Sequence, residues 1–133
     1  MKKTILYLCV VVVMMVSSCG GNEIRKEDLA AQAAKSYYDS LFAGDYEYFA
    51  RGFVGVDSVP PHYLEQLTVN AKQYIHEQKE AHGGVSGVEI ISAKSDTAVC
   101  VTNVFLLLCF ADGVKEEIVV PMVEMQNGGW LMK

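Results

Sequence analysis

The hydrophobic and polar residues of this chain follow two different periods, one in each half. From Lys26 to about Gly84, apolar positions recur every three or four residues, which is the period of an amphipathic helix. From Gly87 onward the chain consists of shorter apolar runs separated by turn signals, which is typical of strands. The pattern therefore predicts helices first and an antiparallel sheet afterwards.

Three helices are predicted in the first half. The first spans about Lys26 to Gly44, and its apolar face begins with alanines, which allow close approach to another element. Asp45 is suited to cap a short second helix, and Gly52 to Pro61 is predicted to be a loop because glycines and a Pro-Pro pair interrupt regular structure. The last proline of that loop is favoured in the first turn of a third helix, which ends at Gly83-Gly84. The buried stripe predicted for this third helix is Leu64, Leu67, Ala71, Tyr74 and Ile75.

Four strands are predicted in the second half, arranged as a meander. Asp112-Gly113 is a strong hairpin signal between the second and third strands, and Pro121 marks a bulge or an edge position in the third. Three helices followed by a curved four-stranded antiparallel sheet predict a single α+β domain at 26–133, with the helices packed on one sheet face. The strands are expected at 87–94, 97–111, 114–126 and 130–133.

The beginning of the chain predicts where it is processed. Lys2-Lys3 precede an uncharged run from Thr4 to Val16, which is shorter than the roughly 20 apolar residues of a transmembrane helix but fits a secretory signal. The order Val16-Ser17-Ser18-Cys19 then resembles the lipobox of bacterial lipoproteins. This resemblance implies removal of the signal peptide at 1–18, lipid on the cysteine, and a short tether at 19–25 before the domain.

A lipidated Cys19 implies a cell-envelope protein anchored to a bacterial membrane, facing either the periplasm or the cell surface. Two or three acyl chains hold a protein firmly, whereas a single chain holds it only marginally. An ordinary cleaved signal with an incidental cysteine and an uncleaved anchor remain the alternatives. We therefore expect the membrane to be a partner through the lipid on Cys19.

The charge of the chain argues against nucleic acid as a partner, and the spacing of its cysteines argues against a disulfide. Without Lys2 and Lys3, 9 basic residues face 16 acidic ones for a formal charge of −7, and no dense basic patch indicates binding to nucleic acid. Cys100 and Cys109 would lie about 30 Å apart along one strand, whereas a disulfide requires Cα atoms within about 7 Å. We expect both to be buried free thiols.

No metal, cofactor or catalytic residue is predicted. The stretch His76 to His82 (HEQKEAH) is similar to a zinc protease motif, but its histidines are six residues apart rather than four and project from different helix faces. Asp57 and His62 could form an acid–base pair, although no third polar group is available to orient the histidine. A surface loop with helix-capping residues is the alternative interpretation.

Several segments together resemble a known superfamily. They are the helix pair AAKSYYDSLFAGDYEYFA, the Asp-Gly hairpin and the closing strand GGWLMK. They are similar to the nuclear transport factor 2-like superfamily, and more narrowly to small lipoproteins of unknown function with this cystatin-like cone fold from Bacteroides-type gut bacteria. The resemblance implies a cone of helices folded over a bent sheet, which often encloses a pocket. Some members are enzymes and others only bind.

Aromatic residues concentrated in the helices are the candidates for lining such a pocket. A tyrosine offers an apolar ring to a planar ligand and a hydroxyl that needs a partner when buried. Asn103, an amide inside an apolar strand, faces either the cavity or the outer side of the sheet. Packing in the core is the alternative for the rings. The candidate lining residues are Tyr37, Tyr38, Tyr46, Phe49, His62, Tyr63 and Asn103.

The stretch Phe105 to Phe110 (FLLLCF) is apolar on both strand faces, so both faces of the sheet need a cover. Helices can cover one face, and we expect a second copy of the chain to cover the other as a homodimer. A long N-terminal or C-terminal segment folded over that face is the alternative. The expected function is a non-catalytic small-molecule-binding or accessory interaction module. A small cofactor-free isomerase, dehydratase or hydrolase and a purely structural docking lipoprotein remain alternatives.

Overall fold

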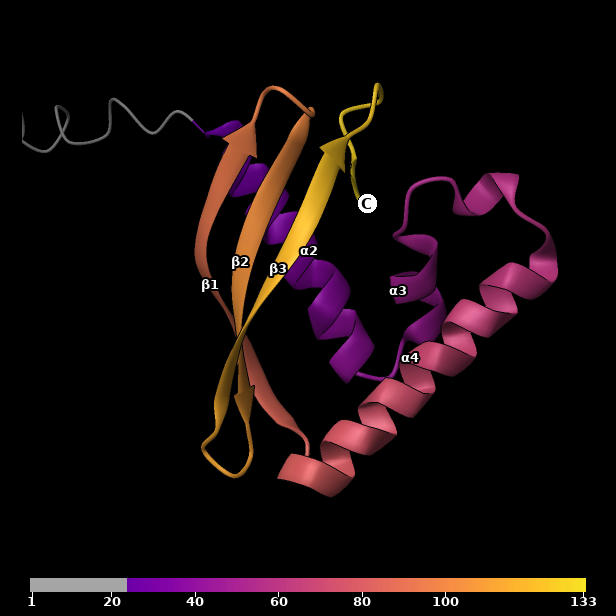
Figure 1. Ribbon diagram of the computed structural model, residues 1–133, viewed down its shortest axis with the longest axis vertical. Coiled ribbons are helices and arrows are strands. Elements are labelled where there is room, and N and C mark those ends of the chain that lie inside the picture. The colour runs from indigo at the N-terminus through magenta and orange to yellow at the C-terminus, as the bar shows by residue number, and fades with distance from the viewer. Residues whose placement is uncertain (1–23) are drawn as a thin grey trace, which may run out of the picture.

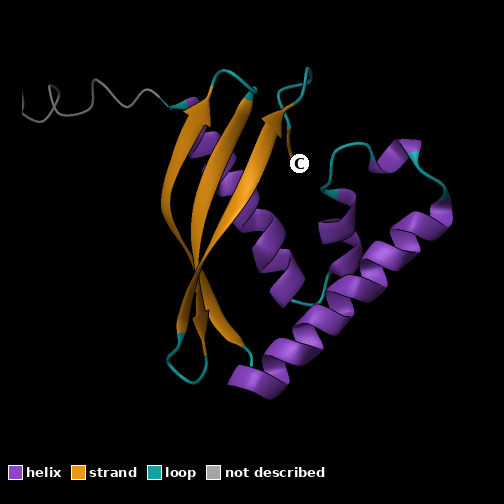
Figure 2. Ribbon diagram, in the orientation of Figure 1, coloured by secondary structure: helices purple, strands orange, loops and turns teal. Residues whose placement is uncertain are grey.

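The computed structural model describes residues 24–133, which fold as three α-helices followed by a four-stranded antiparallel sheet (Figure 1). This confirms the predicted α+β architecture, with helices and strands in separate layers (Figure 2). The expected signal peptide (1–18), Cys19 and the tether up to residue 23 lie outside the described residues. The elements are α2 (Lys26–Phe42), α3 (Tyr46–Arg51), the 3-10 helix η1 (Val56–Ser58), α4 (Pro61–His82), β1 (Val85–Asp96), β2 (Val101–Phe110), β3 (Lys115–Glu124) and β4 (Trp130–Met132).

Local sequence signals define the helix ends as predicted. Asp45 caps α3, because its side chain accepts a hydrogen bond from the Tyr48 backbone N–H at 3.1 Å. Pro61 is the first residue of α4, where a backbone N–H is not needed. Gly83 follows α4 in the left-handed region, at a φ of 78°, which glycine adopts without the strain of a side chain.

The sheet is a meander in the order β1-β2-β3-β4. Register shifts between Val85 and Gly87 and after Ile90 mark irregularities in β1, and such bulges bend a strand. The hairpin between β2 and β3 turns at Asp112-Gly113, as predicted. The Asp112 side chain accepts a hydrogen bond from the Val114 N–H at 3.0 Å, which stabilises this turn.

Two details of the strands refine or correct the prediction. β2 begins at Val101 rather than near Thr97, because residues 97–100 form a turn in which Cys100 has a φ of 53°. The expectation that Cys100 is buried is therefore wrong: its thiol is free and exposed, and that of Cys109 is free and half-buried. Pro121 lies in regular register on β3, just past the end of β4, so it occupies an edge position rather than a bulge.

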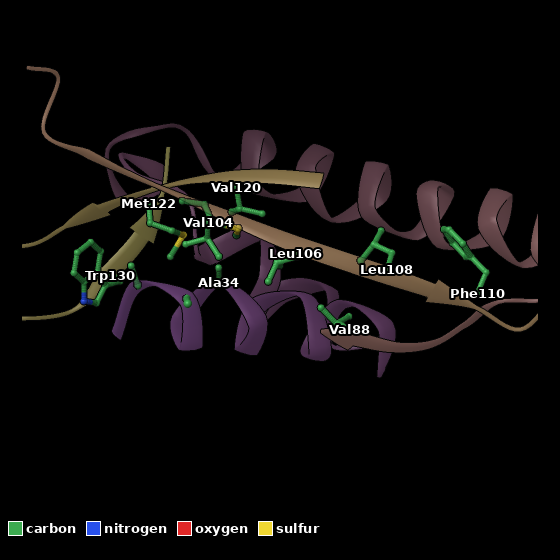
Figure 3. Close-up of a cluster of buried hydrophobic side chains, with 12 residues drawn as sticks. Ala34, Val88, Val104, Leu106, Leu108, Phe110, Val120, Met122 and Trp130 are labelled. Carbon is green, nitrogen blue, oxygen red and sulfur yellow. The ribbon is translucent and has the colours of Figure 1, made fainter. Parts of the chain in front are cut away.

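The core lies between α2 and one face of the sheet (Figure 3). Ala30 and Ala34 of α2 are completely buried, and their small side chains let the helix approach the strands closely. Alternate residues of the strands point toward this helix, as the period of a strand requires. On β2 and β3 these inward-facing residues include Val104, Leu106, Leu108, Phe110, Val120 and Met122.

Contacts among α2, α3 and β4 close one side of the space between the helices and the sheet, which we call the closed side. The Tyr37 hydroxyl donates a hydrogen bond to the Trp130 carbonyl at 2.7 Å. The chain after α3 pairs with β4, since the Val54 N–H donates to the Met132 carbonyl at 2.8 Å and the Met132 N–H donates to the Gly52 carbonyl at 2.7 Å. A Cβ atom added at Gly52 would lie 2.6 Å from the Tyr37 ring, so the packing leaves no room for a methyl group.

The long helix α4 leans away from the sheet, with its C-terminal end nearest the strands (Figure 1). It packs mainly on α3. Its predicted buried stripe is consequently only partly covered: Ala71 is buried, whereas Leu64, Leu67, Tyr74 and Ile75 are half-buried. Within residues 24–133, no helix is both long and apolar enough to cross a membrane.

Candidate ligand-binding cleft

A cleft of about 440 Å³ opens between the helices and β3. It is larger than two other surface hollows, which measure about 300 and 390 Å³. Its volume lies within the roughly 300–1,000 Å³ that is typical of small-molecule sites. The lining residues are Tyr38 and Leu41 from α2, Phe49 from α3, Tyr74 from α4, and Glu116, Ile118 and Val119 from β3.

The cleft exists because side-chain size changes along α2. The early turns of this helix present alanines to the sheet, whereas its last turns present Tyr38 and Phe42. Tyr38 packs edge-to-face against Phe49 with ring centres 5.3 Å apart, and Phe42 meets Tyr74 of α4 at 6.5 Å. These rings act as spacers that hold α3 and α4 at a distance from the strands.

The titratable groups of the cleft are two tyrosines and one carboxylate. Burial raises the pKa of Tyr38 to about 12, so its hydroxyl stays protonated at neutral pH. Burial also raises the pKa of Tyr74, and the negative charge of Glu116 raises it further. Both hydroxyls are therefore neutral hydrogen-bonding groups, and Glu116 supplies the charge of the cleft.

Two of the seven residues predicted to line a pocket, Tyr38 and Phe49, line this cleft. Tyr37 projects from α2 about 100° around the helix from Tyr38, and its hydroxyl donates to the Trp130 carbonyl of β4. Tyr46 lies at the start of α3, and Lys72 Nζ of α4 sits 5.8 Å from the centre of its ring. The tyrosines that are close in sequence therefore lie in three places: the cleft, the closed side beside β4, and the contact between α3 and α4.

The remaining three predicted residues are far from the cleft wall. His62 and Tyr63 are exposed in the first turn of α4. Asn103 lies on the outer face of the sheet, because it alternates along β2 with the inward-facing, buried Thr102 and Val104. Of the two orientations that the sequence left open for Asn103, the structure has the outward one.

Three strand residues of the cleft, Glu116, Ile118 and Val119, were not among the predicted site residues. For Glu116 and Ile118 the overlooked signal is strand parity, whereas Val119 borders the cleft although its side chain has the outward-facing parity of β3. Glu116 has the same parity as the inward-facing Val120 and Met122, so its carboxylate points to the helix side of the sheet. A carboxylate on a core-facing parity requires water or a partner, because burying an unpaired charge is costly.

No three His, Cys, Asp or Glu side chains within residues 24–133 lie close enough together to hold a metal ion. The two histidines of HEQKEAH instead have separate partners. His76 Nε2 lies 3.1 Å from Glu80 Oε1, and His82 Nδ1 lies 2.8 Å from Asp112 Oδ2 while its ring stacks on Phe110. The hydrogen bond from His82 lowers the pKa of Asp112, and the contact joins the end of α4 to the β2–β3 hairpin.

A smaller hollow lies at the N-terminal end of α2, beside the exposed Cys100. Trp130 also lines it. Its indole Nε1, drawn in blue in Figure 3, is buried without a hydrogen-bond partner in the part of the chain that the structure describes. Because this nitrogen is fully buried, a ligand in the hollow cannot reach it without a rearrangement. Lys26, which also lines the hollow, is already paired with Glu124 at 2.6 Å. The cleft is therefore the better candidate site.

Comparison with known proteins bears on the fold. No protein-family model matches the chain, and no curated protein matches it. Among solved structures, the chain is similar to a Campylobacter jejuni protein that carries the provisional description NTF2-like transpeptidase. The TM-score is 0.61 and the sequence identity 14%, and the match covers 76% of this chain and 94% of that chain. Together with the order of three helices and a four-stranded meander, this likeness shows that the chain has an NTF2-like fold.

Proposed function

We propose that this protein is a lipid-anchored cell-envelope protein that binds a small apolar or aromatic molecule in the cleft without transforming it. The observation that carries the proposal is the cleft, a space of about 440 Å³ with Tyr38, Phe49 and Tyr74 in its wall. If the side chains filled the space between helices and sheet completely, only docking of a partner protein on the surface would remain as a function. An open cone with polar groups in an apolar wall is the usual form of a small-molecule site.

The chemistry of the wall supports binding rather than catalysis. Phe49 and Ile118 offer apolar surface, and the hydroxyls of Tyr38 and Tyr74 can orient a ligand by hydrogen bonding. A general acid or base works best with a pKa near the working pH, whereas burial raises the pKa of Tyr38 to about 12. Glu116 is exposed, and the described lining holds no histidine or second carboxylate beside it.

The membrane anchor in this proposal rests on the sequence alone. The order Val16-Ser17-Ser18-Cys19 after a short apolar run supports cleavage before the cysteine and its acylation. Peptide mass spectrometry of the protein from its membrane tests this. We expect an N-terminal peptide that begins at Cys19 and carries diacylglycerol and a further acyl chain. A peptide that retains residues 1–18, or an unmodified Cys19, would contradict the anchor.

A second copy of the chain is the proposed cover for the outer sheet face, which lies away from α2. Val119 is 53% exposed on this face. Three rows of outward-facing residues cross the strands on this face: an acidic row, a middle row and a row that contains Lys94. If a twofold axis runs along the middle row, the acidic row of one copy lies on the Lys94 row of the other. This charge complementarity supports a homodimer. The three rows are Glu89–Leu107–Glu117, Ser92–Phe105–Val119 and Lys94–Asn103–Pro121.

A charge exchange tests the dimer. In this arrangement Glu89→Lys or Lys94→Glu alone places like charges opposite each other, and the double variant restores the attraction. We expect sedimentation to show a dimer whose dissociation constant rises about thirtyfold in each single variant and recovers in the double variant, because an exposed pair worth about 1 kcal/mol is lost in each of two symmetric contacts. A monomeric parent protein, or no recovery in the double variant, would contradict this dimer.

Native mass spectrometry tests the binding function itself. The full-length protein is extracted in mild detergent from the cells that make it, beside an Ile118→Trp variant that fills the cleft. Val69→Trp, on an exposed position of α4, is the matched control. We expect a reproducible small-molecule adduct on the parent protein and on the control but not on the filled variant. An adduct that persists in Ile118→Trp, or a parent protein without adduct, would contradict the proposal.

A further inference from the structure

The one charged group in the described lining of the cleft is the carboxylate of Glu116. None of the ion pairs formed within residues 24–133 includes it. Glu116 sits on β3 opposite Leu108 of β2, on the side of the sheet that faces the helices. An exposed carboxylate on the helix side of the sheet, without an ion-pair partner within residues 24–133, is available to pair with a positive charge from outside the chain.

We propose that the cleft binds a cationic amphiphile, a molecule with an aromatic or apolar body and an amine or quaternary ammonium head. The head lies between Glu116 and Tyr74, and the body extends toward Tyr38, Phe49 and Ile118. This inference rests on the binding function proposed above and specifies the ligand class of the same site.

The two groups that hold the head come from opposite walls. Glu116 belongs to β3 and Tyr74 to α4, yet the charge of Glu116 is close enough to contribute to the raised pKa of Tyr74. A cation between a carboxylate and an aromatic ring gains both ion pairing and attraction to the ring's negative face. An anionic ligand would meet the carboxylate with no lysine, arginine or histidine in the described lining to offset it.

The rest of the wall suits the body of such a ligand. Apolar surface comes from Tyr38, Phe49 and Ile118, and Tyr38 stays uncharged because burial keeps its hydroxyl protonated. The formal net charge of the whole chain, −5, also favours the approach of cations over anions. Body, head and overall charge therefore favour the same ligand class.

Two soluble probes of nearly the same shape test this inference. Phenyltrimethylammonium carries the cationic head, and 2-phenyl-2-propanol replaces it by a neutral tetrahedral carbon. Isothermal titration of the full-length protein in detergent gives both dissociation constants. Glu116→Gln removes the inward carboxylate. Glu65→Gln is the matched control, because it makes the same change of charge at an exposed position of α4 outside the cleft lining.

We expect the cationic probe to bind about tenfold more tightly than the neutral probe, to lose this advantage in Glu116→Gln, and to keep it in Glu65→Gln. Equal binding of both probes would overturn the cation inference while leaving the binding function intact. No binding of either probe would count against both. Equal losses in the two glutamine variants would also overturn the inference, because they would indicate a general effect of net charge.

Discussion

The contact between helices and sheet is closed on one side and open on the other, although the same helix contributes to both. On the closed side, alanines of α2 lie against the strands, and Gly52 leaves no room for a methyl group beside Tyr37. On the open side, Tyr38 and Phe42 of the same helix meet aromatic rings of α3 and α4, and a cleft of about 440 Å³ remains. Small side chains therefore close the layer, and large ones act as spacers that open it.

Two matched truncations test the difference between the closed and the open side. They should give the largest effect on the free energy of unfolding. Leu106 and Ile118 are cross-strand neighbours in one row of the sheet, but Leu106 is fully buried whereas Ile118 borders the cleft. Leu106→Ala should lower the free energy of unfolding by about 2–5 kcal/mol, because it leaves a void in a packed core. Ile118→Ala should cost about 1 kcal/mol or less, because it only widens a space that is already open.

Urea denaturation followed by the fluorescence of Trp130, the single tryptophan, measures both variants. The difference between the two losses is the informative quantity, since both substitutions remove similar apolar groups. Equal losses would mean that the two positions are packed alike, and the contrast between a closed and an open side would then fail.

The stability of the protein at alkaline pH tests whether Tyr38 is buried on the open side. Because burial raises the pKa of Tyr38 from 10.0 to about 12, the unfolded chain loses this proton at lower pH than the folded one. Stability is therefore fully present below about pH 10 and falls as pH rises toward 12, by about 2 kcal/mol for this group.

Tyr38→Phe removes the titrating group and should flatten this part of the profile. Tyr63→Phe, at an exposed position outside the cleft, is the control and should keep the alkaline loss of the parent protein. Denaturant titrations at several pH values between 9 and 12 give the comparison. A profile that Tyr38→Phe leaves unchanged would show that this ring is not buried against the cleft wall.

The smallest expected effect concerns the closed side. Gly52→Ala would place a Cβ atom 2.6 Å from the Tyr37 ring and strain the hydrogen bond from Tyr37 to Trp130. We expect a loss of about 1–2 kcal/mol in the free energy of unfolding from this overpacking. Gly87→Ala is the control, because nothing lies within 4 Å of a Cβ atom there. If both alanines were tolerated equally, the closed side would not be as tightly packed as described.

The features predicted from the sequence are those that adjacent residues determine. The cap at Asp45, the first turn at Pro61, the end of α4 at Gly83 and the hairpin at Asp112-Gly113 each depend on a few neighbouring residues, and all are confirmed. The fold class followed from these elements and from the two hydrophobic periods.

The cleft could not be predicted from neighbouring residues in the same way, because it depends on where elements distant in the sequence meet. The sequence shows that Tyr74 and Leu67 are apolar positions of a helix, but not that rings from α2 hold this helix away from the strands. Glu116 was detectable by its parity on β3, yet only in combination with the correct strand register. Cys100 was misplaced because an apolar sequence continues through a turn.

The open space between α4 and β3 is where we expect a ligand to bind. Amide chemical-shift mapping of the isotope-labelled protein with phenyltrimethylammonium tests it most directly. We expect shifts concentrated at Tyr38, Phe49, Tyr74, Glu116 and Ile118, with Trp130 and the alanine face of α2 unaffected. Shifts concentrated on the outer sheet face around Phe105, or scattered over the surface without a focus at the cleft, would contradict it.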